Sequence, residues 1–173
     1  MALPLIVLGA GIAAAYASNQ ISKHNDRKNG IVGAFPGESK FTVEPQTGGI
    51  VCCDVYEMFE HSGIWVDGNV IELQGTGLIR GISPSRFTHD RSGNTIYVAC
   101  DCNNTPLTDN TLMQRAVSKL YEYRDYHVVK NNCNRFVAEC LSGTDQGITT
   151  FTELNHFLSD HFGQPIYWLP AAV

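Results

Sequence analysis

The chain has 173 residues, a composition ordinary for a soluble globular protein and a formal net charge of −5. This length suits one domain with a substantial hydrophobic core. The acidic balance and the lack of a basic run in the sequence argue against nucleic acid as a partner. The six cysteines do not have the spacing of a disulfide ladder, which predicts reduced thiols in a cytosol-like compartment.

An apolar segment opens the chain, and its residues 2–17 are almost wholly hydrophobic. As a helix they would be roughly 24 Å long, somewhat short of the ~30 Å hydrocarbon core of a bilayer unless the helix continues towards Ile21. The basic residues Lys23 and Arg27 follow directly and would place the rest of the chain in the cytoplasm. The sequence therefore predicts an N-terminal apolar helix at residues 1–21 that anchors the protein to a membrane.

Two other interpretations of this segment stay open. A cleaved signal peptide fits the small residues of Ala15-Tyr16-Ala17 and would export the mature chain, although the segment lacks the positively charged start of such peptides. A buried helix that packs on the domain would need no membrane.

The next residues, 22–47, are polar and rich in turn-forming glycine and proline, which predicts a tether with little regular structure. The globular domain is therefore expected at residues 48–173. Short apolar runs at its start predict an antiparallel meander. The expected strands are 49–54, 58–66, 69–74, 78–82 and 95–100, with a tight turn at Asp67-Gly68 and a short helical turn that begins at Pro84.

Three helices with apolar faces follow, each with a recognisable cap. Together with the strands they predict an α+β fold in which helices pack against a small antiparallel sheet. The expected elements are a helix from Asp109 or Asn110 to about Tyr123, a strand at 126–129, a helix between Asn132 and Gly143, a helix from the capping box of Thr150 and Glu153 to Gly163, and an edge strand at 166–169.

Cys133 is the strongest candidate for a nucleophile. Asn132 is a suitable N-cap, and apolar residues follow Cys133 at helical spacing, so the thiol is expected in the first turn of a helix. The helix dipole there favours a thiolate over a thiol, and a thiolate is the nucleophile of acyl-transfer chemistry. An inert buried thiol is the alternative, and Cys140, two turns further along the same face, is expected to belong to the core.

A cysteine nucleophile needs a base, and the base needs an orienting partner. His61 lies in the middle of an expected strand, and Glu72 is an unexpected acidic residue within the next apolar strand. The hairpin at Asp67-Gly68 would bring the two onto neighbouring strands, where the carboxylate would fix the imidazole tautomer. The alternatives are a structural histidine and a glutamate that points to solvent.

A zinc site formed by Cys100 and Cys102 with Cys52 or Cys53 is a further alternative. The spacing matches no standard paired-ligand site, and Cys52 and Cys53 would point to opposite faces of a strand. The favoured thiol chemistry uses no metal and no cofactor.

Three motifs, taken in this order, resemble the lecithin:retinol acyltransferase (LRAT) family, and more closely its bacterial members. The family pairs a His-x-Gly-Ile-(aromatic)-Val strand with an Asn-Cys-x-x-Phe helix start, and the likeness covers roughly residues 48–143. The matching stretches are His61-Ser62-Gly63-Ile64-Trp65-Val66, Val70-Ile71-Glu72-Leu73 and Asn131-Asn132-Cys133-Asn134-Arg135-Phe136. The resemblance implies an NlpC-type, papain-like thiol fold that is circularly permuted, so that the histidine precedes the cysteine in the chain.

By position, the resemblance implies that Cys133 is the nucleophile and His61 the general base. Glu72 falls where the vertebrate acyltransferases have a second histidine and where other permuted members have an acidic or amide residue. The implied reaction is a ping-pong acyl transfer from a lipid or other acyl ester through an acyl-thioester. A cysteine peptidase or amidase that cleaves peptide or peptidoglycan bonds, and a non-catalytic binding domain, are the alternative functions.

Overall fold

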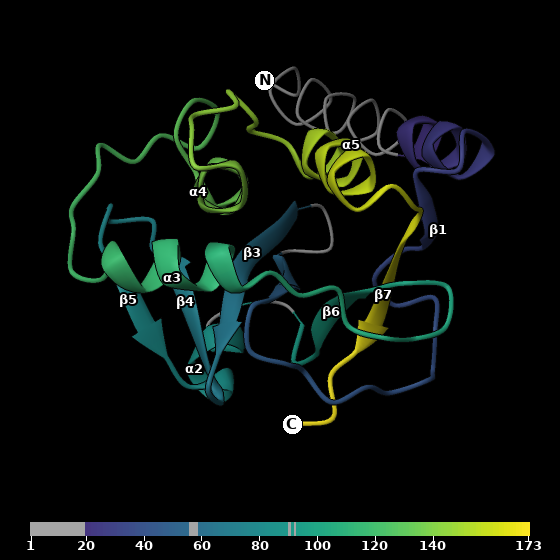
Figure 1. Ribbon diagram of the computed structural model, residues 1–173, viewed down its shortest axis with the longest axis horizontal. Coiled ribbons are helices and arrows are strands. Elements are labelled where there is room, and N and C mark those ends of the chain that lie inside the picture. The colour runs from purple at the N-terminus through teal and green to yellow at the C-terminus, as the bar shows by residue number, and fades with distance from the viewer. Residues whose placement is uncertain (1–19, 56–58, 90, 92) are drawn as a thin grey trace, which may run out of the picture.

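A computed structural model describes residues 20–55, 59–89, 91 and 93–173 of the protein. Seven strands of this part form one sheet, in the order β1-β7-β6-β2-β3-β4-β5 (Figure 1). Every neighbouring pair is antiparallel except β1 and β7, which are parallel. The strands are β1 (Val32–Ala34), β2 (Gly49–Val55), β3 (Phe59–Val66), β4 (Asn69–Leu73), β5 (Ile79–Ile82), β6 (Ile96–Cys100) and β7 (Ile166–Pro170).

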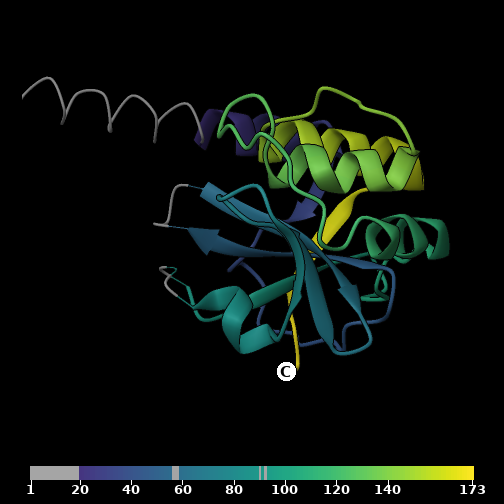
Figure 2. The same ribbon diagram turned by 90° about the vertical axis from the view of Figure 1, so that its left-hand side faces the viewer.

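Helices cover both faces of the sheet unequally (Figure 2). On one face, buried residues of three helices, such as Leu112, Phe136 and Leu154, pack with Ile50 and Ile64 of the sheet in one core. On the other face a smaller core forms around Phe87 of a short helix. The helices are α2 (Pro84–Thr88), α3 (Asn110–Ser118), α4 (Cys133–Ser142) and α5 (Phe151–Phe162), and residues 20–28 are also helical. The α+β architecture is therefore confirmed.

Local signals in the sequence predicted most of these elements well. Strands β2 to β6 lie within one residue of the expected bounds. Asn132 caps α4 and Gly143 ends it in a left-handed conformation, with a φ of 83°. The capping box of Thr150 and Glu153 opens α5. Caps and alternating apolar residues act over a few residues, so they can be recognised without the tertiary structure.

The segment predicted to be a tether, residues 22–47, contains regular structure that joins it to the sheet. Strand β1 pairs with β7, and Val43 forms a bridge to Ala171. Val32 and Phe35 are buried in the main core. Isolated apolar residues between turns have no local periodicity, so only their distant partners reveal that they are anchored.

Three further expectations are wrong. Strand β7 is not an edge strand, because β1 pairs with its outer side. Residues 126–129 contain turns and a single bridge, from His127 to Asn131, rather than a strand. Helix α3 ends at Ser118, several residues early. There the chain bends through Tyr121, which has a φ of 69°, and its N–H donates to the carbonyl of Ile79. Residues 121–124 thereby cover the outer edge of β5, which would otherwise expose unpaired backbone groups.

Most of the predicted apolar helix at residues 1–21 lies outside the described residues. Among the helices within the described ranges, none is both long and apolar enough to cross a membrane.

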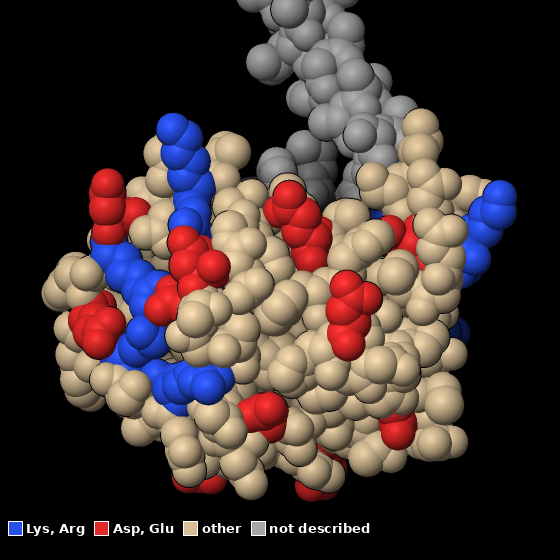
Figure 3. Space-filling view, turned by 45° about the horizontal axis from the view of Figure 1, so that its top comes forward, with Lys and Arg blue, Asp and Glu red and all other residues tan. Residues whose placement is uncertain are grey.

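Basic and acidic side chains lie side by side at the left of the surface shown in Figure 3. The ion pairs on α4 include Arg124 with Glu139, whose nearest atoms are 2.6 Å apart, and Lys119 with Glu139 at 3.0 Å. Arg135 pairs with Asp145 close by. The Arg124–Glu139 and Arg135–Asp145 pairs line a cleft of about 390 Å³. Because these charged side chains already bind one another, we assign them to the stability of α4 and its loops.

Two glycines with left-handed backbone conformations allow a test of how closely residues 121–124 pack at the edge of the sheet. One lies next to this segment and the other has open space around it. A Cβ atom on Gly77, whose φ is 91°, would lie 2.0 Å from the carbonyl oxygen of Arg124, whereas a Cβ atom on Gly68, whose φ is 80°, would meet no atom within 4 Å. We expect Gly68→Ala to lower the free energy of unfolding by about 1 kcal/mol, from backbone strain alone. Gly77→Ala should lower it by about 3 kcal/mol or more. Urea unfolding of both variants measures these changes. Equal losses of unfolding free energy would contradict the close packing of the Arg124 backbone against Gly77.

Candidate active site

Asn132 fixes the position of the thiol at the first residue of α4. Its side-chain oxygen accepts hydrogen bonds from the backbone N–H groups of Asn134 and Arg135, at 3.1 and 3.3 Å. Its amide nitrogen donates to the carbonyl oxygens of Val128 and Thr149, both at 2.6 Å. Aspartate or serine would cap the helix equally well but lacks the two donors. Asn132 therefore ties α4 to the two loops that border the pocket.

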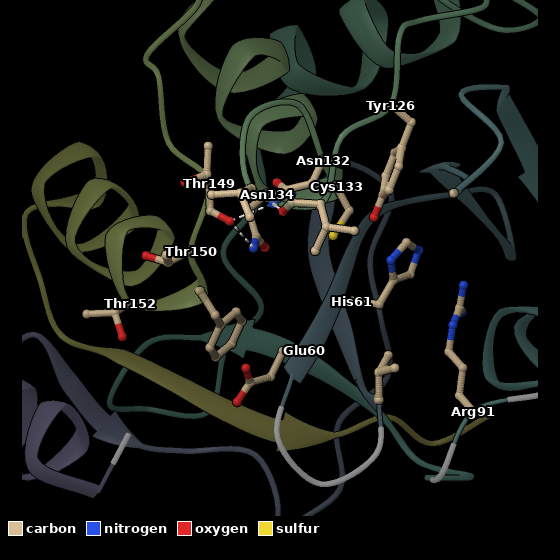
Figure 4. A pocket seen from close by; sticks show the side chains of 15 residues that line it. Glu60, His61, Arg91, Tyr126, Asn132, Cys133, Asn134, Thr149, Thr150 and Thr152 are labelled. Carbon is tan, nitrogen blue, oxygen red and sulfur yellow. Dashed lines mark hydrogen bonds between the residues drawn. The ribbon is translucent and has the colours of Figure 1, made fainter. Parts of the chain in front are cut away.

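The sheet opens where His61 meets Cys133. Strand β3 pairs with β2 from Phe59 to Trp65, but with β4 only from Ile64 to Val66. The His61 end of β3 is thus free on its β4 side, and the N-terminus of α4 lies beside it. Figure 4 shows the Cys133 sulfur, the His61 ring and the Tyr126 hydroxyl directed toward one another across one side of a pocket.

The room beside Gly63 is taken by the protein itself. A Cβ atom on this residue would lie 2.5 Å from Val70 and 3.2 Å from Phe87, so no ligand has room beside it. Gly63 therefore permits tight packing of β3 against its neighbours.

The thiol and the imidazole form an activated pair. Burial acts to raise the pKa of Cys133, but the charge and hydrogen bond of His61, with hydrogen bonds from Ser62, outweigh it and lower the pKa to about 7. Burial acts to lower the pKa of His61, but the Cys133 charge and the hydrogen bonds to Cys133 and Glu72 raise it to about 9. The opposite shifts favour the pair of thiolate and imidazolium over the neutral pair.

Glu72 lies completely buried beneath this pair. Its Oε2 atom is 2.7 Å from Nε2 of His61. Because Glu72 engages Nε2, the Nδ1 atom is the ring nitrogen left to face the thiol. Burial acts to raise the pKa of Glu72, but the bonds and charges of His61 and of two arginines lower it to about 2. The structure thus brings together Cys133, His61 and Glu72, and their catalytic roles remain a prediction.

Sequence reasoning missed the two arginines that bind Glu72. Arg80 donates to Oε1 through Nε at 2.9 Å and through Nη2 at 2.8 Å. Arg91 donates to Oε2 at 3.0 Å, so it shares that oxygen with His61. Arg80 lies directly opposite Glu72 in the β4–β5 register, a signal that the hairpin contained. Arg91 follows α2, and no local pattern links it to Glu72.

A pocket of about 540 Å³ opens in front of Cys133. Its apolar lining includes Val55, Val128, Val129 and Phe151. Val128 and Val129 are 67% and 66% exposed, so they form an apolar rim at the pocket. Glu60 also lines it, and burial raises the pKa of its carboxyl to about 7. The pocket therefore offers mainly apolar surface beside a reactive thiol.

Tyr126 belongs to the pocket, apart from the other tyrosines of its segment. Tyr121 and Tyr123 are 79% and 75% exposed and are not among the residues that line the pocket. Burial, followed by the negative charge of Cys133, raises the pKa of Tyr126. Its neutral hydroxyl is therefore a donor close to the thiolate.

The remaining cysteines are free thiols without the arrangement of a metal site. Cys52 and Cys53 belong to the two different cores, as strand alternation predicted, and Cys102 is exposed. Within the described part of the chain, no group of three or more histidine, cysteine, aspartate or glutamate residues could hold a metal ion. The zinc alternative therefore finds no support among these residues.

Comparison of the chain with models of known protein families and with curated proteins finds no match. The likeness to the LRAT family therefore rests on the three motifs alone. Function has to be inferred from the pocket and the residues around it.

The pH dependence of Cys133 alkylation should reveal whether His61 lowers the pKa of the thiol. Because the thiolate is the reactive form, we expect alkylation of Cys133 by iodoacetamide to be half-maximal near pH 7. In His61→Ala the imidazolium is lost, so the midpoint should rise above pH ~8.5. Peptide mass spectrometry measures the rate at each pH, with the exposed Cys102 as a reference thiol in the same sample. A wild-type midpoint that His61→Ala does not move would refute the pairing.

Glu72→Gln should lower the stability of the protein as well as the reactivity of Cys133. The amide would leave two guanidinium groups near a buried site without their counter-charge, so we expect the free energy of unfolding to fall by about 3 kcal/mol. Urea unfolding at pH 7 measures this loss, with exposed Glu122→Gln as the charge-matched control. Equal stability of the two variants would show that Arg80 and Arg91 do not depend on the Glu72 charge.

Proposed function

We propose that the chain is a cysteine-dependent acyltransferase or hydrolase that acts on lipid esters through an acyl-thioester intermediate. The observation that carries the proposal is the contact series from Cys133 to His61 to Glu72 at an apolar pocket. A thiol with a lowered pKa, a base that touches it and a carboxylate that orients the base are the parts that nucleophilic acyl transfer needs. The three motifs that resemble the LRAT family agree with this interpretation, because the resemblance implies a permuted, papain-like thiol fold.

In the first half of the reaction, the Cys133 thiolate attacks the ester carbonyl carbon and forms a carbon–sulfur bond. The backbone N–H of Cys133 at the start of α4 and the hydroxyl of Tyr126 are the donors available to the oxyanion. As the bond from the carbonyl carbon to the leaving oxygen breaks, the His61 imidazolium gives that oxygen its proton. The products are an alcohol and the acyl-thioester of Cys133.

In the second half, the acceptor is an alcohol, an amine or water. Neutral His61 takes the proton of the acceptor as it attacks the thioester carbonyl, and the carbon–sulfur bond breaks to restore the thiolate. The neutral ring keeps its Nε2 proton on the bond to Glu72, so Nδ1 is free to accept. The product is an ester, an amide or a carboxylic acid.

The apolar lining favours a lipid substrate over a polar one. Val128 and Val129 extend the apolar surface of the pocket to its rim, where an acyl chain would enter. A membrane anchor at residues 1–21, with the catalytic domain on the cytoplasmic side, would suit this substrate. An exported chain would favour the alternative of a peptidase or amidase, for which Asn134, Thr149 and Thr150 supply hydrogen-bonding groups in the same pocket.

The proposal predicts an acyl group on Cys133. We expect incubation with mixed phospholipid to add an acyl mass to the wild-type protein, mapped to Cys133 and removed by hydroxylamine, as for a thioester. Cys133→Ala, which deletes the sulfur, should stay unmodified. Intact-protein and peptide mass spectrometry measure both. A short peptide ester tested in parallel separates the two substrate classes, because acylation by that donor alone would favour the peptidase.

No adduct from either donor would contradict the proposal if Cys133 also resists iodoacetamide in the folded protein. That pair of results would favour a non-catalytic binding domain, in which Cys133 is an inert thiol. Adduct formation in Cys133→Ala would equally remove Cys133 from the nucleophile role.

A further inference from the structure

One oxygen of Glu72 serves two cations. Nε2 of His61 lies 2.7 Å from Oε2, and Nη2 of Arg91 lies 3.0 Å from the same atom. The other oxygen, Oε1, is held by two N–H groups of Arg80. Arg80 therefore holds one oxygen by itself, whereas Arg91 contacts the oxygen that also binds His61.

Arg91 is itself held firmly. Its guanidinium lies over the Phe87 ring, 4.9 Å from the ring centroid, and its Nη1 atom is 3.7 Å from the sulfur of Cys53. The side chain is 16% exposed and lines the pocket. The positive charge of Arg91 is thus kept beside the catalytic base in a partly desolvated site, where charges act strongly. Figure 4 shows the Arg91 guanidinium near the His61 ring.

The groups that face His61 act in opposite directions on its proton. Glu72 and the Cys133 thiolate favour the imidazolium, whereas the Arg91 charge disfavours it. Arg80 binds the far oxygen of Glu72, and among the described residues the thiol of Cys53 and the hydroxyl of Tyr126 also face the ring. Without Arg91, His61 would face two anions and keep its proton more tightly. A base that holds its proton too tightly protonates a leaving group poorly.

We propose that Arg91 is a positioning residue that limits the basicity of His61 by sharing the carboxylate oxygen of Glu72, so that the imidazolium can give its proton to the leaving group. The proposal rests on the proposed acyl transfer for its chemical meaning. The effect of Arg91 on His61, however, can be measured in the free protein.

The test is an NMR titration of the His61 ring nitrogens in the full chain, compared with the variant Arg91→Met. Removal of the competing cation should raise the pKa of His61 by about one unit. Arg91→Lys keeps the charge and should leave the His61 pKa near its wild-type value. Arg86→Met removes an exposed arginine from α2 and should leave the pKa unchanged.

A second variant and a second readout keep the test decisive. Arg91→Gln removes the charge but keeps a donor for Glu72, so it should shift the His61 pKa in the same direction even if Arg91→Met does not fold. In Arg91→Met, acylation by an alkyl ester should slow by about threefold more than acylation by a nitrophenyl ester, whose leaving group needs no proton.

An unchanged His61 pKa in folded Arg91→Met or Arg91→Gln would overturn the proposal, and so would an equal shift in Arg86→Met. Equal slowing of the two esters would also overturn it, because a merely structural defect affects both alike. Failure of the acyl-transfer proposal would look different, since neither ester would then acylate wild-type Cys133 while the His61 titration could still respond to Arg91.

Discussion

The buried carboxylate of Glu72 is the interaction on which the rest of the site depends. A charge without solvent costs several kcal/mol unless it is paired and hydrogen-bonded. Glu72 meets this requirement through side chains from β3, from β5 and from the segment after α2. The same contacts that make the charge tolerable also orient His61. The geometry of the candidate site therefore depends on the same contacts as the packing of this end of the sheet.

The thiol is controlled by a second set of polar contacts, which are centred on Asn132. Its four hydrogen bonds bind the start of α4 to the loops at Val128 and Thr149. Burial alone would make Cys133 an inert thiol, as it does for Cys140, whose pKa burial raises to about 12. The difference between the two cysteines of α4 lies in their partners. Cys133 faces His61 and Ser62, whereas Cys140 is packed in the main core.

The N-terminal part of the described chain also touches this region. Lys23 lies 3.9 Å from Glu60, which lines the pocket, and Asp26 binds His156 of α5 at 2.7 Å. The helix at residues 20–28 is thus attached to a residue that lines the pocket and to α5. For the proposed lipid substrate, this attachment would keep the pocket close to any membrane that the preceding apolar segment enters.

Local chemistry in the sequence was enough to predict the α+β class, the positions of strands β2 to β6, the caps of α4 and α5, and the candidacy of Cys133, His61 and Glu72. Caps, turns and apolar alternation depend on neighbours a few residues away, so they can be read from the chain directly. The tertiary structure alone revealed the parallel pairing of β1 with β7, the early end of α3, and the places of Tyr126 and Arg91 around the thiol. Each of these depends on residues far apart in the chain, whose contacts are decided by packing and by the pairing of charges and leave no local pattern.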